Sequence, residues 1–161
     1  MAEVFLSIGS NIEREKNIAS AVDTLKERFG QLTLSSVYDT EAVGFEGAPF
    51  YNMVVGFESD LPVVEIVKIL KEIEKQHGRQ RISEKFSARA LDLDLILYGD
   101  LILDEAHLQL PRPELMDYAF MLEPLAELAP DLRHPITRER YADLWERFDK
   151  TNLRQKKVAA P

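Results

Sequence analysis

The sequence predicts an α+β fold, in which a mostly antiparallel sheet has both helices on one face and is followed by a C-terminal helical extension. Apolar residues recur at helical spacing in two segments, near 13–28 and 61–77. Short strand-like runs surround these segments, so the order is strand, helix, strand, strand, helix, strand. That order is the ferredoxin-like βαββαβ arrangement.

The first half of this pattern extends from a buried strand at Val4–Ile8 to a strand at Phe50–Glu58. Gly30 suits the C-cap of the first helix, and a further strand is expected within Leu32–Tyr38. The segment Asp39–Pro49 carries glycines and a proline and is expected to be a loop. Its apolar tip makes it a candidate functional loop, although apolar loop residues more often pack against the core.

The second half begins with a helix for which Asp60 is the expected N-cap. Gly99 and Asp100 predict a turn after the next strand, and Leu101–Leu103 predicts a strand that returns beside it as a hairpin. The C-terminal extension is expected to contain extended chain, a helical turn and two helices, at 110–113, Glu114–Tyr118, Phe120–Leu128 and Tyr141–Phe148. The tail 150–161 lacks apolar periodicity and is expected to be flexible.

Composition narrows the classes of function. The chain has 161 residues, of which 45% are hydrophobic and 30% charged, so we expect one domain, 1–161, with a core of its own. A formal net charge of −8 argues against nucleic acid or an anionic membrane as a partner. Cysteine is absent, which excludes disulfides and thiolate metal sites. No signal peptide or membrane helix is evident, so we expect a cytoplasmic protein, and a monomer is the expected state.

The stretch from Leu91 to Leu95 alternates apolar and acidic residues, which predicts a strand with one apolar and one polar face. Asp92 and Asp94 then point the same way, roughly 7 Å apart along the strand. Paired carboxylates of this kind suit Mg²⁺, which binds one or two carboxylates together with phosphate oxygens. An edge strand with a solvated face gives the same pattern, and the alternation alone favours that simpler explanation.

A basic segment lies directly before this strand. It carries Arg79, Arg81, Lys85 and Arg89 against the single acid Glu84. Arginine recognises phosphate through paired hydrogen bonds, and a basic cluster in an acidic protein is unusual. The two stretches together predict a cationic loop that brings a polyphosphate to a metal-bearing strand.

Two further polar residues lie where apolar ones are expected. Asn52 is in a strand, and its amide either bonds a neighbouring loop or contacts a ligand. Glu74 lies near the apolar stripe of its helix and is either a boundary residue or reaches into a site.

Four motifs together resemble a known family. They are Gly9-Ser-Asn, Gly78-Arg-Gln-Arg, Arg89-Ala-Leu-Asp-Leu-Asp and Phe120-Met-Leu-Glu-Pro-Leu. From about Val4 to Pro135 the chain resembles the 6-hydroxymethyl-7,8-dihydropterin pyrophosphokinases of folate biosynthesis. The resemblance implies transfer of the terminal diphosphate of ATP to the hydroxymethyl group of a reduced pterin, with release of AMP.

The resemblance also implies roles for particular residues. It implies ATP as co-substrate and two Mg²⁺ ions held by Asp92 and Asp94, with Arg79, Arg89 and Asp94 as catalytic residues. The implied ATP-binding residues are Glu74, Arg79, Arg81, Arg89 and Arg112. The implied pterin-binding residues are Thr40, Val43, Gly44, Phe50, Asn52, Phe86, Asp92 and Phe120.

The sequence departs from the family pattern at several positions. Arg112 stands where members usually have His, and Tyr118 stands where an Arg that meets the ATP phosphates is common. Phe86 replaces a Trp found in some members, and Ser87-Ala88 replaces Gly-Pro or Gly-Ala. The first two changes motivate an alternative, a non-catalytic relative that binds nucleotide or pterin. A ferredoxin-like RNA-binding module is disfavoured because the strands lack stacking aromatics and the net charge is negative.

Overall fold

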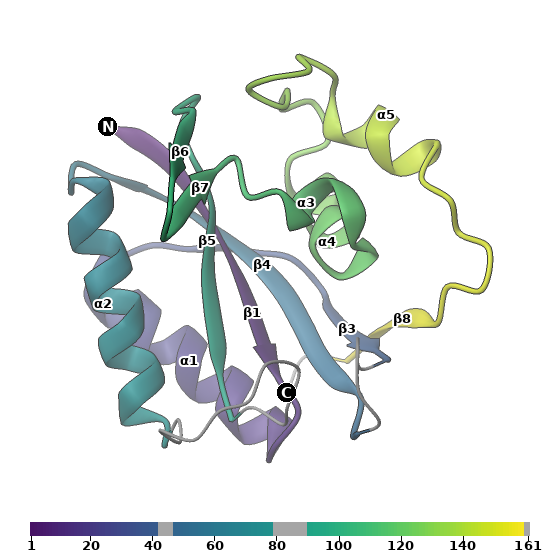
Figure 1. Ribbon diagram of the computed structural model, residues 1–161. Helices are drawn as coiled ribbons and strands as arrows, with labels where there is room; N and C mark the ends of the chain where they lie inside the picture. Colours follow the sequence, from purple (N-terminus) through teal and green to yellow (C-terminus); the bar gives the residue numbers. More distant parts are fainter. Residues whose placement is uncertain (42–46, 79–89, 160–161) are drawn as a thin grey trace.

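The computed structural model describes residues 1–41, 47–78 and 90–159. These form one antiparallel sheet with helices on both faces, as Figure 1 shows. Its strand order is β5-β1-β4-β3-β8, and β2 pairs with β4. The strands are β1 Ala2–Ser10, β2 Thr33–Leu34, β3 Val37–Thr40, β4 Phe50–Ser59, β5 Asp92–Tyr98 and β8 Gln155–Val158. A separate hairpin consists of β6 Leu103–Glu105 and β7 Leu108–Leu110.

The helices are α1 Arg14–Phe29, α2 Val63–Gln76, α3 Glu114–Asp117, α4 Ala119–Leu128 and α5 Tyr141–Glu146. In Figure 1, α1 and α2 cover one face of the sheet, and α3, α4 and α5 lie on the other side. The prediction of an antiparallel ferredoxin-like sheet with both N-terminal helices on one face is therefore confirmed. Among the described residues, no helix is both long enough and apolar enough to span a bilayer.

Alternation along the strands divides the core into two layers. Leu6 and Ile8 of β1 pack with apolar residues of α1 and α2, such as Leu25 and Ile66. Phe5, the neighbour of Leu6, points to the opposite face and packs with residues of α4 and α5. A fully buried leucine or phenylalanine contributes about 1.5–3 kcal/mol, so both helical layers are held by their apolar faces.

A polar contact at Glu127 helps to fasten α4 to the sheet. The carboxylate of Glu127 accepts hydrogen bonds from the Tyr38 hydroxyl, at 2.7 Å, and from the Ser36 hydroxyl, at 2.6 Å. Burial opposes ionisation of Glu127, but these hydrogen bonds outweigh it and lower the pKa of the carboxyl group. Burial, reinforced by the nearby carboxylate, raises the pKa of Tyr38, so its hydroxyl stays a donor. The contact fixes α4 over β3.

Of the two helix caps predicted at Gly30 and Asp60, the first is confirmed and the second is wrong. Gly30 ends α1 with a positive φ of 85° and donates its N–H to the Lys26 carbonyl, as expected. Asp60 does not cap α2: the N-cap is Pro62, whose carbonyl accepts the Ile66 N–H. Asp60 instead lies 3.5 Å from the amino group of Met1, because β1 begins beside the end of β4, where Ala2 pairs with Ser59.

The predicted hairpin between β5 and residues 101–103 is wrong. The turn after β5 forms, and Gly99 adopts a positive φ of 53°. Leu101 and Ile102 then remain exposed, and β6 pairs with β7 across the short turn at 106–107. A later segment contacts the edge of β5 instead: the Arg112 N–H donates a hydrogen bond to the Ile96 carbonyl at 3.0 Å. The local hairpin partner and this later contact replace the expected pairing.

The prediction of a flexible tail is wrong for Gln155–Val158, which form β8. They pair with β3 in a register that places Lys156 opposite Asp39, a favourable cross-strand pair of charges. The Gln155 amide also donates to the Ala119 carbonyl and to Glu123 on α4. The sequence Gln-Lys-Lys-Val has no apolar alternation, so this strand depends on its partners rather than on its own pattern.

Removing residues 155–161 tests whether β8 stabilises the fold. We expect the free energy of unfolding to fall by roughly 2 kcal/mol, since several backbone hydrogen bonds and both Gln155 contacts are lost. Urea denaturation measures the change. A chain that lacks only 159–161 is the control and should keep its stability; equal stability of both truncated chains would contradict the assignment of β8.

The buried His134 predicts a dependence of stability on pH. Its side chain is 5% exposed, and Nδ1 accepts the N–H groups of Ile136 and Thr137. Burial lowers the pKa of the imidazole, although the nearby Glu139 opposes this effect. Because the unfolded chain then binds the proton more readily, the free energy of unfolding should fall as pH drops below the ordinary histidine pKa of about 6.5.

The variant His134→Asn isolates this contribution, because asparagine keeps an acceptor near the two N–H groups but does not titrate. Urea denaturation at pH 7.5, 6.5 and 5.5 should show a steeper loss of stability in the original protein than in the variant. Parallel losses in the two proteins would show that His134 does not contribute.

Candidate functional site

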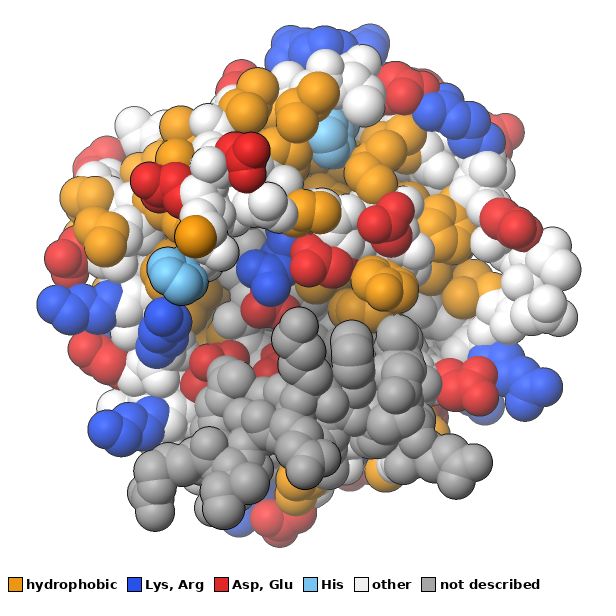
Figure 2. All heavy atoms as spheres, in the orientation of Figure 1, with side chains coloured by type: hydrophobic (Ala, Val, Ile, Leu, Met, Phe, Trp, Pro, Cys, Tyr) orange, Lys and Arg blue, Asp and Glu red, His pale blue; other side chains and the backbone are white. Residues whose placement is uncertain are grey.

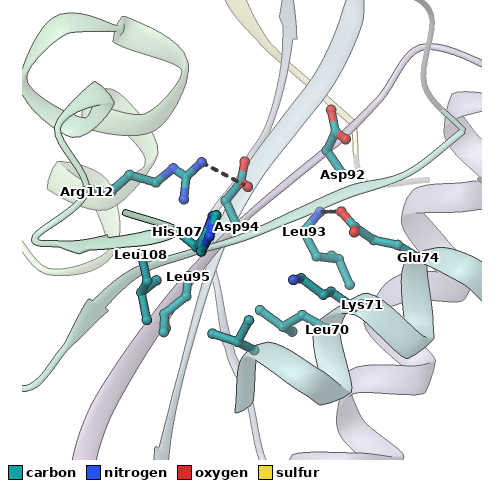
Figure 3. A pocket seen from close by; sticks show the side chains of 11 residues that line it. Leu70, Lys71, Glu74, Asp92, Leu93, Asp94, Leu95, His107, Leu108 and Arg112 are labelled. Carbon is teal, nitrogen blue, oxygen red and sulfur yellow. Dashed lines mark hydrogen bonds and ion pairs between the residues drawn. The ribbon is translucent and has the colours of Figure 1, made fainter. Parts of the chain in front are cut away.

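A cavity of about 370 Å³ lies between α2, β5 and the β6–β7 hairpin. Apolar residues such as Leu70 and Leu93 line its inner part. Its polar lining consists of Lys71, Glu74, Asp92, Asp94, His107 and Arg112. Figure 2 shows acidic and basic side chains close together near the centre of this face, and Figure 3 shows the cavity from nearby. Opposite charges around a pocket suit a ligand that has both anionic and apolar parts.

Asp92 and Asp94 reach this region because β5 alternates as the sequence predicts. Leu93 and Leu95 are buried in the core on the α2 side, and the two carboxylates project from the other side of the strand (Figure 3). The register with β1 places Asp92 opposite Gly9 and Asp94 opposite Ser7. The described part of β5 is an edge strand of the sheet, so this feature of the simpler interpretation is also present. The charged pocket beside it distinguishes the site from an ordinary solvated face.

Glu74 is buried, with 6% of its surface exposed, and lies on α2 beside β5. Its Oε2 accepts the N–H of Leu93 at 2.8 Å. Leu93 lies between the two aspartates, so this bond fixes the strand that carries them. Glu74 therefore reaches into the site, one of the two alternatives left open by the sequence, and it also joins α2 to β5.

Arg112 enters the site from the chain that follows β7. Its Nη2 lies 3.4 Å from Asp94 Oδ1, and its Nε lies 3.4 Å from Glu114 Oε2. The structure thus brings the predicted Arg112 to the predicted Asp94. Glu114 is a site residue that sequence reasoning missed, because an acid two positions after an arginine does not by itself predict contact.

A second group of predicted residues meets on the same side of the sheet as the aspartates. Asn52 and Thr40 are both buried, and the Asn52 amide donates to the Thr40 hydroxyl at 2.5 Å. The amide thus bonds a neighbouring strand rather than a loop. Phe50, half-buried at the start of β4, pairs with Thr40 in register.

Gly9 joins the two groups and was not predicted as a site residue. Register places Asp92, Gly9 and Asn52 in one row across β5, β1 and β4. Strands lie about 4.8 Å apart, so the backbones of the outer two residues are separated by roughly 10 Å, and Gly9 adds no side chain of its own between them. A Cβ at Gly9 would lie 2.7 Å from Asn52 Oδ1. The signal in the sequence was a glycine inside a strand, which often marks a close approach.

Phe120 lies on α4 and is half-buried. Its ring stacks on Tyr118, with centroids 5.3 Å apart. Tyr118, one of the departures from the family pattern, therefore supports the ring of a predicted pterin-binding residue.

Several predicted site residues lie outside the residues that the structure describes. They are Val43, Gly44, Arg79, Arg81, Phe86 and Arg89. In the described ranges, no three or more His, Asp or Glu side chains form a cluster that could hold a metal ion. Two carboxylates on one side of a strand still fit Mg²⁺, because this ion commonly completes its coordination with water and substrate phosphates.

Comparison with known proteins gives a family and close relatives. The family model described as 7,8-dihydro-6-hydroxymethylpterin-pyrophosphokinase (HPPK) matches residues 5–130. A 2-amino-4-hydroxy-6-hydroxymethyldihydropteridine pyrophosphokinase of Aquifex aeolicus is 35% identical over 141 residues, which cover 86% of this chain and 88% of that protein. The protein of the same name from Porphyromonas gingivalis is 38% identical, with 84% and 95% covered.

Solved structures agree on the fold. An HPPK-DHPS chain of Plasmodium falciparum superposes with a TM-score of 0.76 at 13% identity and covers 98% of this chain. This chain spans only 45% of that larger one. At such low identity the likeness establishes the architecture and nothing more.

The contact between Gly9 and Asn52 predicts the effect of Gly9→Ala. The added methyl group displaces the Asn52 amide from Thr40 and should lower the free energy of unfolding by about 1–3 kcal/mol. Adding Asn52→Ala removes the clashing atom, so the double variant should lose less stability than the sum of the two single changes. Denaturant unfolding measures all three proteins. Strict additivity would contradict the contact.

Proposed function

The chain belongs to the 7,8-dihydro-6-hydroxymethylpterin-pyrophosphokinase family, and from this premise we propose how its residues divide the work of the reaction. It is an ATP-dependent diphosphotransferase of folate biosynthesis, and it transfers the pyrophosphoryl group of ATP to the hydroxymethyl group of the dihydropterin. The hydroxymethyl oxygen attacks the β-phosphorus in line, the bond from that phosphorus to the oxygen of the α-phosphate breaks, and AMP leaves.

The proposed metal ligands are Asp92 and Asp94, which would hold two Mg²⁺ ions. Their position on one side of β5, at the edge of a charged pocket, supports this assignment. Bound there, magnesium supplies neutralisation of phosphate charge and polarisation of the phosphoryl group. Register with β1 and the bond from Leu93 to Glu74 keep the two carboxylates in place.

ATP would occupy the pocket between α2, β5 and the β6–β7 hairpin. The apolar inner part suits the base, and the end near Asp94 and Arg112 suits the phosphates. Glu74 lines this pocket and is the proposed acid of the nucleotide site. Arg79, Arg81 and Arg89 are proposed to contact the phosphates from the basic segment, with Arg79 and Arg89 closing on the reacting groups.

The pterin would lie beside the Asn52 amide, in the row that leads to Asp92. Gly9 leaves room for that amide to lie close over β1, and the amide can bond an edge that carries both donors and acceptors. Thr40 orients that amide, while Phe50 and Phe120 offer aromatic surface. Val43, Gly44 and Phe86 are proposed to cover the ring.

The observation that carries this proposal is the position of β5 between the two regions. Asp94 lines the nucleotide pocket, and Asp92 both lines it and stands at one end of the row above Gly9. A nucleotide phosphate and a pterin hydroxymethyl group would therefore meet at the two carboxylates. Such chemistry depends mostly on positioning and charge neutralisation, which this arrangement supplies.

We also propose that residues 1–161 act as one domain, as a monomer in the cytoplasm, on small molecules and without a nucleic acid or membrane partner. The net charge of −8 supports the exclusion of polyanionic partners.

Asp94→Asn tests the assigned metal role. The change keeps the shape of the side chain but removes its charge, so AMP formation from ATP, Mg²⁺ and the reduced pterin should fall about a hundredfold or more. Asp104→Asn on β6, an exposed acid outside the pocket, is the matched control and should keep full activity. Turnover near the original rate in a folded Asp94→Asn protein would refute the role, and absence of AMP with the original protein would favour a non-catalytic relative.

A further inference from the structure

The backbone of Arg112 is fixed to the strand that carries the aspartates. Its N–H donates to the Ile96 carbonyl of β5, and its own carbonyl accepts the Leu115 N–H at 3.1 Å. Leu110 and Leu115 on either side are buried. The starting point of the Arg112 side chain is therefore set relative to Asp94, which lies two residues before Ile96 on the same strand.

The guanidinium group lies between two carboxylates and is held weakly by both. Its distances to Asp94 and Glu114 qualify as ion pairs, yet Arg112 Nε and Glu114 Oε2 have no hydrogen-bonding partner of good geometry among the described residues. Side-chain exposures of 30% for Arg112 and 35% for Asp94 leave the pair open to solvent. An ion pair of this kind is easily exchanged for another partner.

Arg112 and a divalent cation compete for the carboxylate of Asp94. The guanidinium approaches Oδ1, one of the two oxygens with which Asp94 would bind a metal. A metal ion at that carboxylate would repel the guanidinium, since both are cations. The fork of an arginine also matches phosphate oxygens, which arrive with the nucleotide.

We propose that Arg112 is a displaceable counter-ion of Asp94, and that Glu114 is the positioning residue that retains it. Before substrates bind, Arg112 offsets the charge of Asp94 and competes with metal. When the metal and the nucleotide bind, its Nη2 leaves Asp94 for a phosphate oxygen, while the contact of Nε with Glu114 keeps the side chain in the pocket. This inference rests on the metal role that the proposed function gives to Asp94.

The exchange links metal binding to nucleotide binding. ATP draws Arg112 from Asp94 and so strengthens metal binding, and by thermodynamic reciprocity the metal strengthens ATP binding by the same factor. This coupling through Arg112 adds to the coupling that arises from direct contact between metal and phosphate. The coupling through Arg112 disappears when the charge at position 112 is removed.

Equilibrium binding to the full chain tests the proposal without turnover. Mn²⁺ alone serves as the metal probe, followed by electron paramagnetic resonance, and ATP in the presence of EDTA is followed by calorimetry. Arg112→Gln should bind Mn²⁺ about two- to fivefold more tightly, because its competitor is gone, and should bind metal-free ATP about tenfold more weakly. Opposite shifts of this kind are not expected from simple damage to the fold.

Two control variants separate the contact from general charge. Arg112→Lys keeps the cation and should bind Mn²⁺ like the original protein. Lys71→Gln removes a positive charge from the same pocket, and its affinity for Mn²⁺ should change less than twofold. A rise in the Lys71 variant as large as that in Arg112→Gln, or no rise in Arg112→Gln, would overturn the proposal.

Glu114→Gln tests the retaining contact. It should tighten Mn²⁺ binding in the original chain, because Arg112 is then held less firmly beside Asp94, and it should not do so in the Arg112→Gln background; equal effects in both backgrounds would overturn its role. If Arg112→Gln fails to fold, Mn²⁺ binding by Glu114→Gln alone still tests the exchange: tighter binding than in the original protein supports it, and unchanged or weaker binding overturns it. Unchanged Mn²⁺ affinities in the Arg112 and Glu114 variants, together with normal AMP formation by the original protein, would reject the exchange alone. Loss of metal binding in Asp94→Asn without loss of AMP formation would reject the proposed function.

Discussion

The structure depends most on the alternation of β5 in register with β1. Leu93 and Leu95 are buried in the core beneath α2, and this burial forces Asp92 and Asp94 to the other side of the strand. A slip of one residue would bury both carboxylates and expose both leucines, so the hydrophobic core itself fixes the acids in place. The chemistry of the site thus follows from packing on the opposite face.

Other contacts place the remaining parts of the site around this strand. Glu74 joins α2 to the backbone between the two aspartates, and Arg112 is fixed by the Ile96 carbonyl of β5. On the face of the sheet that carries the aspartates, Glu127 holds α4 against β3 through Tyr38 and Ser36. Phe120 on α4 and Thr40 on β3 therefore belong to one fixed frame rather than to independent elements.

Sequence reasoning succeeded where a periodic pattern or a capping glycine is enough. It gave the two long helices, the alternation of β5 and the cap at Gly30, because these features depend on neighbouring residues. It failed where strand pairing depends on residues beyond the segment itself: β6 pairs with β7 instead of returning beside β5, and Gln155–Val158 joined β3 instead of fraying. In the candidate site, Glu114 and Gly9 were missed for the same reason, since each gains its role only from a residue brought near by folding.

The most direct test of the central claim is a crystal structure with Mn²⁺ and a non-hydrolysable ATP analogue, in which anomalous scattering locates the metal. The account predicts manganese bonded to carboxylate oxygens of Asp92 and Asp94, with the phosphates completing its coordination. Manganese bound to the phosphates alone, with both aspartates facing solvent, would contradict it.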